Sequence, residues 1–347
     1  MRVFSETTKR NRISTLQDMP THIEYCPGMP ATAYFSDEKA SALGCIGCIN
    51  PQCMRFDPHE IMCSEAENFP NDQSLNVCAV DALHWDWESD TPIVNTEKCI
   101  NCGACMRRCP VGAIYFDGTV RINKTITDKE AQGTADNDTA TLQAQQIKAL
   151  NKTPKSGILI AESDELFESI YEKLSNIRNN YHNTIARNLL ISLGCRSAMR
   201  RIGDVYTRMD AIYSAADGSF GAVEVEFGWD TLDASRGILD DIAVLFTRYG
   251  IEKDANLPLV ICLQLPNARQ GYWQVVKDVN AVEGIAIGTL TIGAMMLLNW
   301  NGCPLMPDDV TYYLDYDNMD LRSTVSWQIG RQVQLSEKLL GILEPIK

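Results

Sequence analysis

Hydrophobic residues recur at helical spacing in three stretches of the second half of the chain. In each stretch apolar side chains stand three or four positions apart, so that they share one face of a helix. Ser163 precedes the first stretch as an N-cap, and Gly194 and Gly250 follow the other two as stop signals. The pattern predicts helices over 164–177, 183–193 and 233–249.

Short apolar runs between these helices predict strands. Turn residues around Asp217 and Gly218 separate the first two runs, which indicates a hairpin, and Pro258 and Pro266 bound the third run. The predicted strands cover 205–214, 222–227 and 259–265. The order of elements is then helix, hairpin, helix and strand, which predicts an α/β domain with a mixed sheet.

The remaining segments differ from this domain in composition. Residues 1–40 form an N-terminal extension without a clear hydrophobic period. Residues 119–156 are rich in Thr, Asp, Gln, Ala and Lys, which predicts a linker with one short helix near 142–150. These boundaries leave a cysteine-rich domain over 41–118 and the α/β domain over 157–347.

Composition and charge limit the class of protein. The 347 residues, 45% of them hydrophobic, suffice for two or three domains with buried cores, and the net charge of −14 argues against a general polyanion-binding surface. The first residues lack the apolar stretch of a signal peptide, and glycines and threonines interrupt the apolar run over 285–300, so no membrane partner is expected. Thirteen cysteines without an export signal predict a cytoplasmic protein that binds metal.

A run of four cysteines ends at Pro110 and has the spacing C-x₂-C-x₂-C-x₃-C-P. This spacing ligates [4Fe–4S] clusters in bacterial ferredoxins, because the first three thiolates wrap one cluster while the fourth points toward a second. A zinc knuckle is the alternative, but it normally uses two CxxC pairs about 12–20 residues apart. The run therefore predicts iron–sulfur ligation by Cys99, Cys102, Cys105 and Cys109.

A second cysteine run, spaced C-x₂-C-x₄-C, comprises Cys45, Cys48 and Cys53. It resembles the first run of two-cluster ferredoxin domains. That family would place a fourth cysteine at position 57, where this chain has Asp57. The chain departs from the pattern there, and the missing ligand must come from elsewhere.

An internal repeat supplies a candidate for that ligand. The segment Cys78-Ala-Val-Asp-Ala-Leu-His-Trp-Asp parallels the segment Cys109-Pro-Val-Gly-Ala-Ile-Tyr-Phe-Asp, with cysteine, valine, alanine and aspartate at equal offsets. The repeat identifies Cys78 as the displaced fourth ligand. Asp57 and Cys63 are the alternatives.

Residues 41–118 therefore resemble a bacterial-type two-[4Fe–4S] ferredoxin domain. In such domains the last cysteine of each run serves the other cluster. Cys26 has no partner in the sequence and is expected to be structural. The resemblance implies one cluster on Cys45, Cys48, Cys53 and Cys109, and a second on Cys78, Cys99, Cys102 and Cys105.

Three carboxylates gather on the predicted hairpin. Glu224 and Glu226 are two residues apart on one strand and so face the same side, and a turn centred on Asp217 places Asp210 opposite Glu224, with Cβ atoms about 5 Å apart. Like charges at that distance repel, which predicts a divalent cation, Mg²⁺ or Mn²⁺, between them. The alternative is an acidic hairpin whose carboxylates face solvent.

Together these elements resemble the core of the PD-(D/E)XK nucleases, of the BamHI and BglII restriction-endonuclease type, over residues 160–270. The usual lysine is absent, and Glu226 stands in its place. The resemblance implies that Asp210 and Glu224 bind the metal ion and that Glu226 orients or deprotonates the attacking water. It leaves open which helix residue completes the site: Glu168, Glu172 or Asn188.

Arginines are densest just before this hairpin. Their guanidinium groups suit bidentate contacts to phosphate, whereas the alternative is ion pairs with the abundant acids. The phosphate-binding candidates are Arg196, Arg200, Arg201 and Arg208.

Two hypotheses for function follow. The first is an iron–sulfur nuclease that hydrolyses DNA with Mg²⁺ in a restriction or anti-phage defence system, as a homodimer by analogy. The second is a ferredoxin-type electron-transfer protein whose C-terminal domain docks a partner enzyme without catalysis. Both expect an α+β fold, with an N-terminal two-cluster ferredoxin-like domain and a C-terminal α/β PD-(D/E)XK-like domain.

Overall fold

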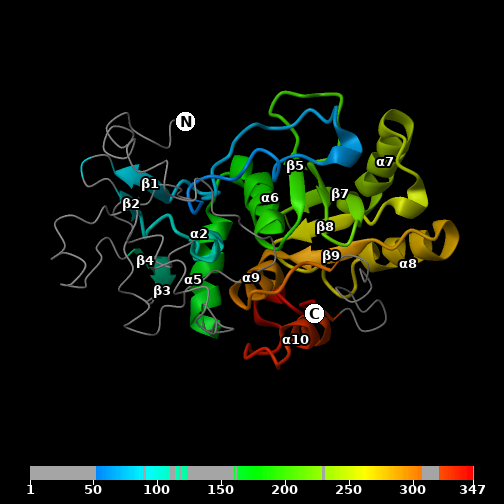
Figure 1. Ribbon diagram of the computed structural model, residues 1–347. Coiled ribbons are helices and arrows are strands. Elements are labelled where there is room, and N and C mark those ends of the chain that lie inside the picture. Colours follow the sequence, from blue (N-terminus) through cyan, green and yellow to red (C-terminus); the bar gives the residue numbers. More distant parts are fainter. Residues whose placement is uncertain are drawn as a thin grey trace. The chain divides into compact units, whose positions relative to one another are not determined.

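A computed structural model gives the fold (Figure 1). It describes residues 52–86, 88, 91–109, 114–116, 119–122, 160, 162–228, 231–306 and 320–346. Cys26, Cys45, Cys48 and the predicted helix near 142–150 lie outside these residues.

The described residues form two compact units that alternate along the chain. Unit 1 contains the described residues before Asp57, those between Asn76 and Ile122, and Trp300–Gly302. Unit 2 contains Asp57–Leu75, Glu162–Asn299 and the described residues after Gly302.

The segment Asp57–Leu75 thus interrupts the domain predicted without a break over 41–118. Backbone hydrogen bonds explain why it folds with unit 2. Ser197 N donates to Glu60 O at 2.9 Å, and Arg201 N donates to Pro70 O at 2.8 Å. The insertion that separates Cys53 from Cys78 is therefore part of the sheet-containing unit.

Two hairpins and one short helix build unit 1. Strand β1 (Leu83–Asp86) pairs with β2 (Thr91–Val94), and β3 (Ile114–Phe116) pairs with β4 (Val120–Ile122), both antiparallel. Helix α2 (Ala104–Arg108) lies in the cysteine run. The linker was predicted to begin at residue 119, but β4 pairs with β3 and so extends this unit.

A five-stranded sheet with the order β5-β6-β7-β8-β9 forms the centre of unit 2 (Figure 1). The first three strands are antiparallel neighbours, and β7, β8 and β9 run parallel. The mixed sheet that the sequence predicts is present. Its strands are β5 (Arg196–Met199), β6 (Ala211–Ser214), β7 (Phe220–Glu226), β8 (Leu259–Cys262) and β9 (Gly288–Thr291).

Helices connect and cover these strands. α6 packs on β5, α7 leads from β7 to β8 and packs on both, and α8 leads from β8 to β9 and contacts α7. The α-helices are α5 (Asp164–Ser175), α6 (His182–Ser192), α7 (Leu232–Tyr249), α8 (Gly271–Glu283), α9 (Ile292–Trp300) and α10 (Arg322–Ile329). Single 3₁₀ turns cover Ser64–Ala66, Asn179–Tyr181, Lys253–Ala255 and Leu339–Gly341.

Local signals account for the helix ends. The Ser163 hydroxyl accepts a hydrogen bond from Leu166 N at 3.2 Å, which is the N-cap that the sequence predicts for α5. Gly250 ends α7 in a left-handed conformation with φ of 70°. Both helices therefore begin and end close to their predicted limits.

The predicted strand over 205–214 is wrong in its first half, since β6 begins only at Ala211. The Asp204 side chain accepts hydrogen bonds from the backbone of Tyr206 and Thr207, which holds this stretch in a loop. Strand β5 was not predicted, because its four residues include only two apolar side chains.

The apolar run over 285–300 contains β9 and α9, which lie in unit 2 up to Asn299, and Met295, Leu297 and Leu298 are fully buried there. Burial in a protein core therefore explains its hydrophobicity. Within the part of the chain that the structure describes, no helix has both the length and the apolar character needed to cross a membrane.

Candidate functional site

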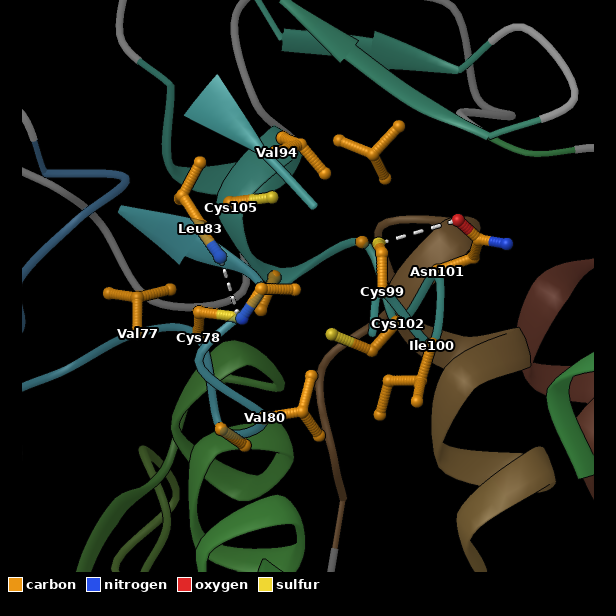
Figure 2. A pocket seen from close by; sticks show the side chains of 15 residues that line it. Val77, Cys78, Val80, Leu83, Val94, Cys99, Ile100, Asn101, Cys102 and Cys105 are labelled. Atoms are coloured by element: carbon orange, nitrogen blue, oxygen red, sulfur yellow. Dashed lines mark hydrogen bonds between the residues drawn. The ribbon is translucent and has the colours of Figure 1, made fainter. Parts of the chain in front are cut away.

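Four cysteines line one pocket in unit 1 (Figure 2). Cys78 precedes β1, Cys99 and Cys102 precede α2, and Cys105 lies within α2. The pocket holds about 410 Å³ of empty space, part of it open to solvent. The four cysteines, which come from separate parts of the chain, thus line one common pocket.

Backbone conformation turns the cysteine loop around this space. Asn101 has a φ of 54° and Gly103 a φ of 81°, two left-handed residues that flank Cys102. Glycine adopts that conformation at no steric cost, and asparagine tolerates it better than most residues. Apolar side chains form the rest of the wall: Val77, Val80, Leu83, Val94, Ile100 and Val120.

Backbone amides point at the sulfur atoms. Ala82 N and Leu83 N donate to Cys78 Sγ at 3.1 and 3.4 Å (Figure 2). The Ala104 amide and the residue's own amide lower the pKa of Cys102, against the larger effect of burial. Donors of this kind stabilise thiolates, which are the form of cysteine that binds metal.

Burial works in the opposite direction and makes bare thiolates unfavourable. It raises the pKa of Cys102 to about 12, with a further contribution from the charges of Cys78 and Cys99. Burial and the charges of the neighbouring cysteines also hold the pKa of Cys105 well above its usual value. Four thiolates in this pocket therefore need cationic charge between them, which the iron of a cluster would supply.

A single metal ion fits the described residues less well. No three His, Cys, Asp or Glu side chains among them converge as ligands of one ion. An iron–sulfur cube separates its ligating sulfurs further than one ion does, so thiols spread around a pocket suit a cluster better than zinc. The residues present thus fit the group that the cysteine spacing predicts.

The two other described ligand candidates, Cys53 and Cys109, are buried but do not line this pocket. Cys53 nevertheless lies close enough to Cys105 to contribute to the raised pKa of that thiol. Their expected partners Cys45 and Cys48 lie outside the described residues, so the first cluster site remains a prediction.

The alternatives to Cys78 lie in unit 2. Cys63 Sγ approaches the carbonyl oxygens of Arg196 and Ile212 at 3.8 and 3.9 Å, and burial raises the pKa of this thiol to about 12. Asp57 is exposed and caps its own turn by accepting a hydrogen bond from His59 N at 2.9 Å. Only Cys78 lines the pocket with Cys99, Cys102 and Cys105.

Asp210 anchors a separate cluster of carboxyl groups in unit 2. It lies just before β6 instead of on the strand, yet the register Ala211↔Val223 extended by one residue places it opposite Glu224, as predicted. Asp210 accepts hydrogen bonds from Asn183 Nδ2 at 2.8 Å and Val225 N at 3.0 Å. Its ion pair with Arg200 measures 3.5 Å.

Glu224 and Asp241 form the buried part of this cluster. Burial, followed by the charges of Asp210 and Asp241, raises the pKa of Glu224 to about 10. Burial likewise raises the pKa of Asp241 to about 6. As the side chains stand, neither oxygen of Asp241 receives a hydrogen bond. If Glu224 is protonated, its carboxyl group can donate a hydrogen bond to Asp241. The two carboxyl groups thus favour sharing a proton or binding a cation.

Asp241 and Asn183 were not among the site residues predicted from the sequence. Asp241 occupies a core position of α7, since it stands in the i, i+3, i+4, i+7 series with Ile238, Ile242 and Leu245, all buried. A charged residue in such a series is a signal that could have identified it. Asn183, at the start of α6, contacts Asp210, whereas the candidate Asn188 accepts a hydrogen bond from Arg187.

The remaining predicted site residues have other partners. Glu226 Oε1 accepts a hydrogen bond from Gly228 N at 2.5 Å. Arg196 pairs with Glu65 at 3.6 Å and Arg208 with Asp240 at 3.4 Å, which agrees with the ion-pair alternative. Arg201 is exposed and pairs through its backbone with Pro70.

Comparison with known proteins identifies the iron–sulfur part. Residues 92–115 match the family described as 4Fe-4S binding domain. An uncharacterized ferredoxin of Methanocaldococcus jannaschii is 34% identical over 84 residues, which cover 22% of this chain and 52% of the relative. Two proteins of Pyrococcus furiosus are also similar. The polyferredoxin-like subunit of an aliphatic sulfonate oxidoreductase is 40% identical over 72 residues (18% of this chain, 40% of the relative), and ketoisovalerate oxidoreductase subunit VorD is 48% identical over 40 residues (11% and 38%).

The chain thus contains an iron–sulfur domain of the 4Fe–4S ferredoxin type within an α+β protein. It spans about half the length, or less, of these curated relatives. No solved structure matches the chain significantly. Neither the family nor these relatives indicate a nuclease, so they favour the electron-transfer hypothesis over the nuclease hypothesis.

Proposed function

We propose that this chain is a ferredoxin-type electron-transfer protein with two [4Fe–4S] clusters. The pocket that Cys78, Cys99, Cys102 and Cys105 share, with amides directed at Cys78 Sγ, carries this proposal. A buried cluster with apolar surroundings and N–H donors is suited to one-electron transfer, because both factors tune its reduction potential.

The first cluster uses Cys45, Cys48, Cys53 and Cys109. Cys109 ends the same cysteine run but stays outside the pocket, in keeping with the exchange of last ligands between clusters in two-cluster domains. Buried Cys53 contributes to the raised pKa of Cys105, which supports a second cluster close to the first.

Unit 2 docks a partner enzyme. Two of the similar proteins are subunits of oxidoreductases, which supports a redox enzyme as the partner. The chain receives electrons at one cluster, passes them to the other and delivers them to the partner.

A turnover experiment tests this function. The protein, reconstituted anaerobically with iron and sulfide, is reduced with dithionite, freed of excess reductant and mixed with an artificial acceptor such as a nitroimidazole. Rapid reoxidation with full retention of iron, over repeated cycles, is the expected result. Clusters that resist reduction, or that lose iron at each cycle, would contradict an electron-transfer role.

A second candidate function is metal-dependent phosphodiester hydrolysis in unit 2. Asp210, Glu224 and Asp241 lie close enough for the charges of the two aspartates to raise the pKa of Glu224, which favours it, within the order of helix, hairpin, helix and strand (α6, β6 and β7, α7, β8) that the nuclease resemblance leads one to expect. A Mg²⁺ or Mn²⁺ ion would have to draw these carboxylates together. It would then polarise a phosphate and activate water, with DNA as the substrate.

Cleavage of supercoiled plasmid in the presence of Mn²⁺ or Mg²⁺ tests this candidate. Asp241→Asn should abolish cleavage, whereas Asp240→Asn, at the exposed neighbouring position of α7, should retain it. Wild-type protein without activity, or activity that survives Asp210→Asn and Glu224→Gln, would reject the nuclease function.

A further inference from the structure

The last residue of α9 and the two residues that follow it belong to the iron–sulfur unit. Trp300–Gly302 group with unit 1, although the preceding residues of the helix belong to unit 2. Two side-chain hydrogen bonds join this short segment to the cysteine run. Trp300 Nε1 donates to Asn101 O at 3.1 Å, and Arg107 Nη2 donates to Gly302 O at 3.1 Å.

Both donor side chains are shielded from water. Trp300 is 0% exposed and Arg107 is 1% exposed. Hydrogen bonds in such surroundings are stronger than at the surface, and an unpaired carbonyl there would be costly. The indole of Trp300 therefore fixes the position of the Asn101 carbonyl group.

The hydrogen bond from Trp300 thus restrains a residue of the cysteine loop, Asn101. It stands between Cys99 and Cys102, two of the residues that line the pocket, with a φ of 54°. Asparagine tolerates this conformation better than most residues but less well than glycine, so contacts from the surrounding structure help to hold it. The hydrogen bond from Trp300 is one contact that does so.

Peptide geometry carries the effect from the Asn101 carbonyl to the Cys102 sulfur. The bond between Asn101 and Cys102 is a planar trans peptide, so its C=O and N–H groups point in opposite directions. Because Trp300 holds the carbonyl group, it also fixes the direction of the Cys102 amide, the backbone N–H of a residue whose thiol lines the pocket. An N–H group that faces a ligating sulfur stabilises the extra negative charge of a reduced cluster and raises its reduction potential.

We propose that Trp300 is a positioning residue that raises the reduction potential of the cluster in the four-cysteine pocket by holding the Asn101–Cys102 peptide. The inference rests on the proposed iron–sulfur function. It assigns a redox role to a residue far from the cysteine motifs in sequence.

Substitution Trp300→Phe removes the N–H donor and keeps an aromatic ring. In the reconstituted full chain we expect unchanged iron content and a reduction equilibrium constant about tenfold less favourable, a midpoint about 59 mV more negative for one electron. A change in the EPR signal of the reduced cluster should accompany this shift. Trp85→Phe is the matched control, because Trp85 is also buried in unit 1 but does not line the pocket.

Equal midpoints for wild type and Trp300→Phe would overturn the inference, and so would an equal shift in Trp85→Phe, since that would indicate general loosening of the unit. Wild-type clusters that cannot be reduced reversibly would instead reject the proposed function itself. If Trp300→Phe fails to retain iron, NMR of wild-type protein labelled with [¹⁵N]tryptophan decides. A slowly exchanging indole N–H with a hyperfine shift that changes on reduction supports the role of Trp300, and a fast-exchanging, unshifted one refutes it.

Discussion

Replacing Cys78 with alanine tests the ligand assignment that departs most from the ferredoxin pattern. The substitution leaves three thiols around the pocket and removes the acceptor of two backbone hydrogen bonds, from Ala82 N at 3.1 Å and Leu83 N at 3.4 Å. Each amide left unsatisfied in a buried site costs about 1–3 kcal/mol. The cluster site should thus lose both a ligand and the local order of the loop that follows.

The expected result is the loss of one cluster. Wild-type protein with two [4Fe–4S] clusters should contain about eight iron atoms per chain, and Cys78→Ala should contain about four. Iron and sulfide analysis after anaerobic reconstitution measures the change, and EPR of the reduced protein should show the loss of spin coupling between two clusters.

Cys63→Ala is the matched control, because Cys63 is the cysteine of the insertion Asp57–Leu75, which separates Cys53 from Cys78. It should keep its full iron content and lose only about 1 kcal/mol of stability, since its buried thiol contacts backbone carbonyls of unit 2. The reasoning fails if Cys78→Ala retains all of its iron, or if Cys63→Ala loses as much.

Three further predictions concern unit 2. The pKa of Glu224, about 10 in the fold against a usual 4.5, means that its contribution to stability is complete below pH 4.5 and is lost as the pH rises toward 10. Glu224→Gln should therefore reduce the decline in unfolding free energy between pH 6 and pH 9, measured by urea titration, by on the order of 1–3 kcal/mol, and an unchanged slope would refute this. Mn²⁺ binding measured by EPR should be lost in Asp241→Asn and kept in Asp240→Asn; equal binding by both variants would exclude Asp241 as a ligand. Asp72→Ala should destabilise the protein by about 2 kcal/mol in urea titrations, because it leaves the fully buried Arg187 guanidinium without its ion-pair partner at 3.8 Å, and a loss within error of zero would contradict that reason.

Much of the cluster site was predictable from the sequence because its information is local. The cysteine spacing, together with the repeat that begins at Cys78 and again at Cys109, predicted the candidate cluster ligands. The structure brings Cys78 to the same pocket as Cys99, Cys102 and Cys105. Periodicity also predicted α5, α6 and α7, whose ends depend on nearby residues such as Ser163 and Gly250.

Features that depend on distant contacts were not predictable in this way. The segment Asp57–Leu75 joins unit 2 through backbone hydrogen bonds to β5 and the loop after it, which no local pattern encodes. Trp300 contacts Asn101 across 199 positions of sequence. The predicted extent of β6 failed at a loop held by Asp204, because its apolar residues Ile202, Val205 and Tyr206 are exposed instead of buried.

The measurement that tests the central claim most directly is a potentiometric titration of the reconstituted protein, followed by EPR at each potential. If the chain carries electrons on two ferredoxin-type clusters, reduction should be reversible and each cluster should contribute one unpaired spin per chain, with one signal absent in Cys78→Ala. Irreversible bleaching on reduction, or a spectrum that Cys78→Ala leaves unchanged, would contradict the claim.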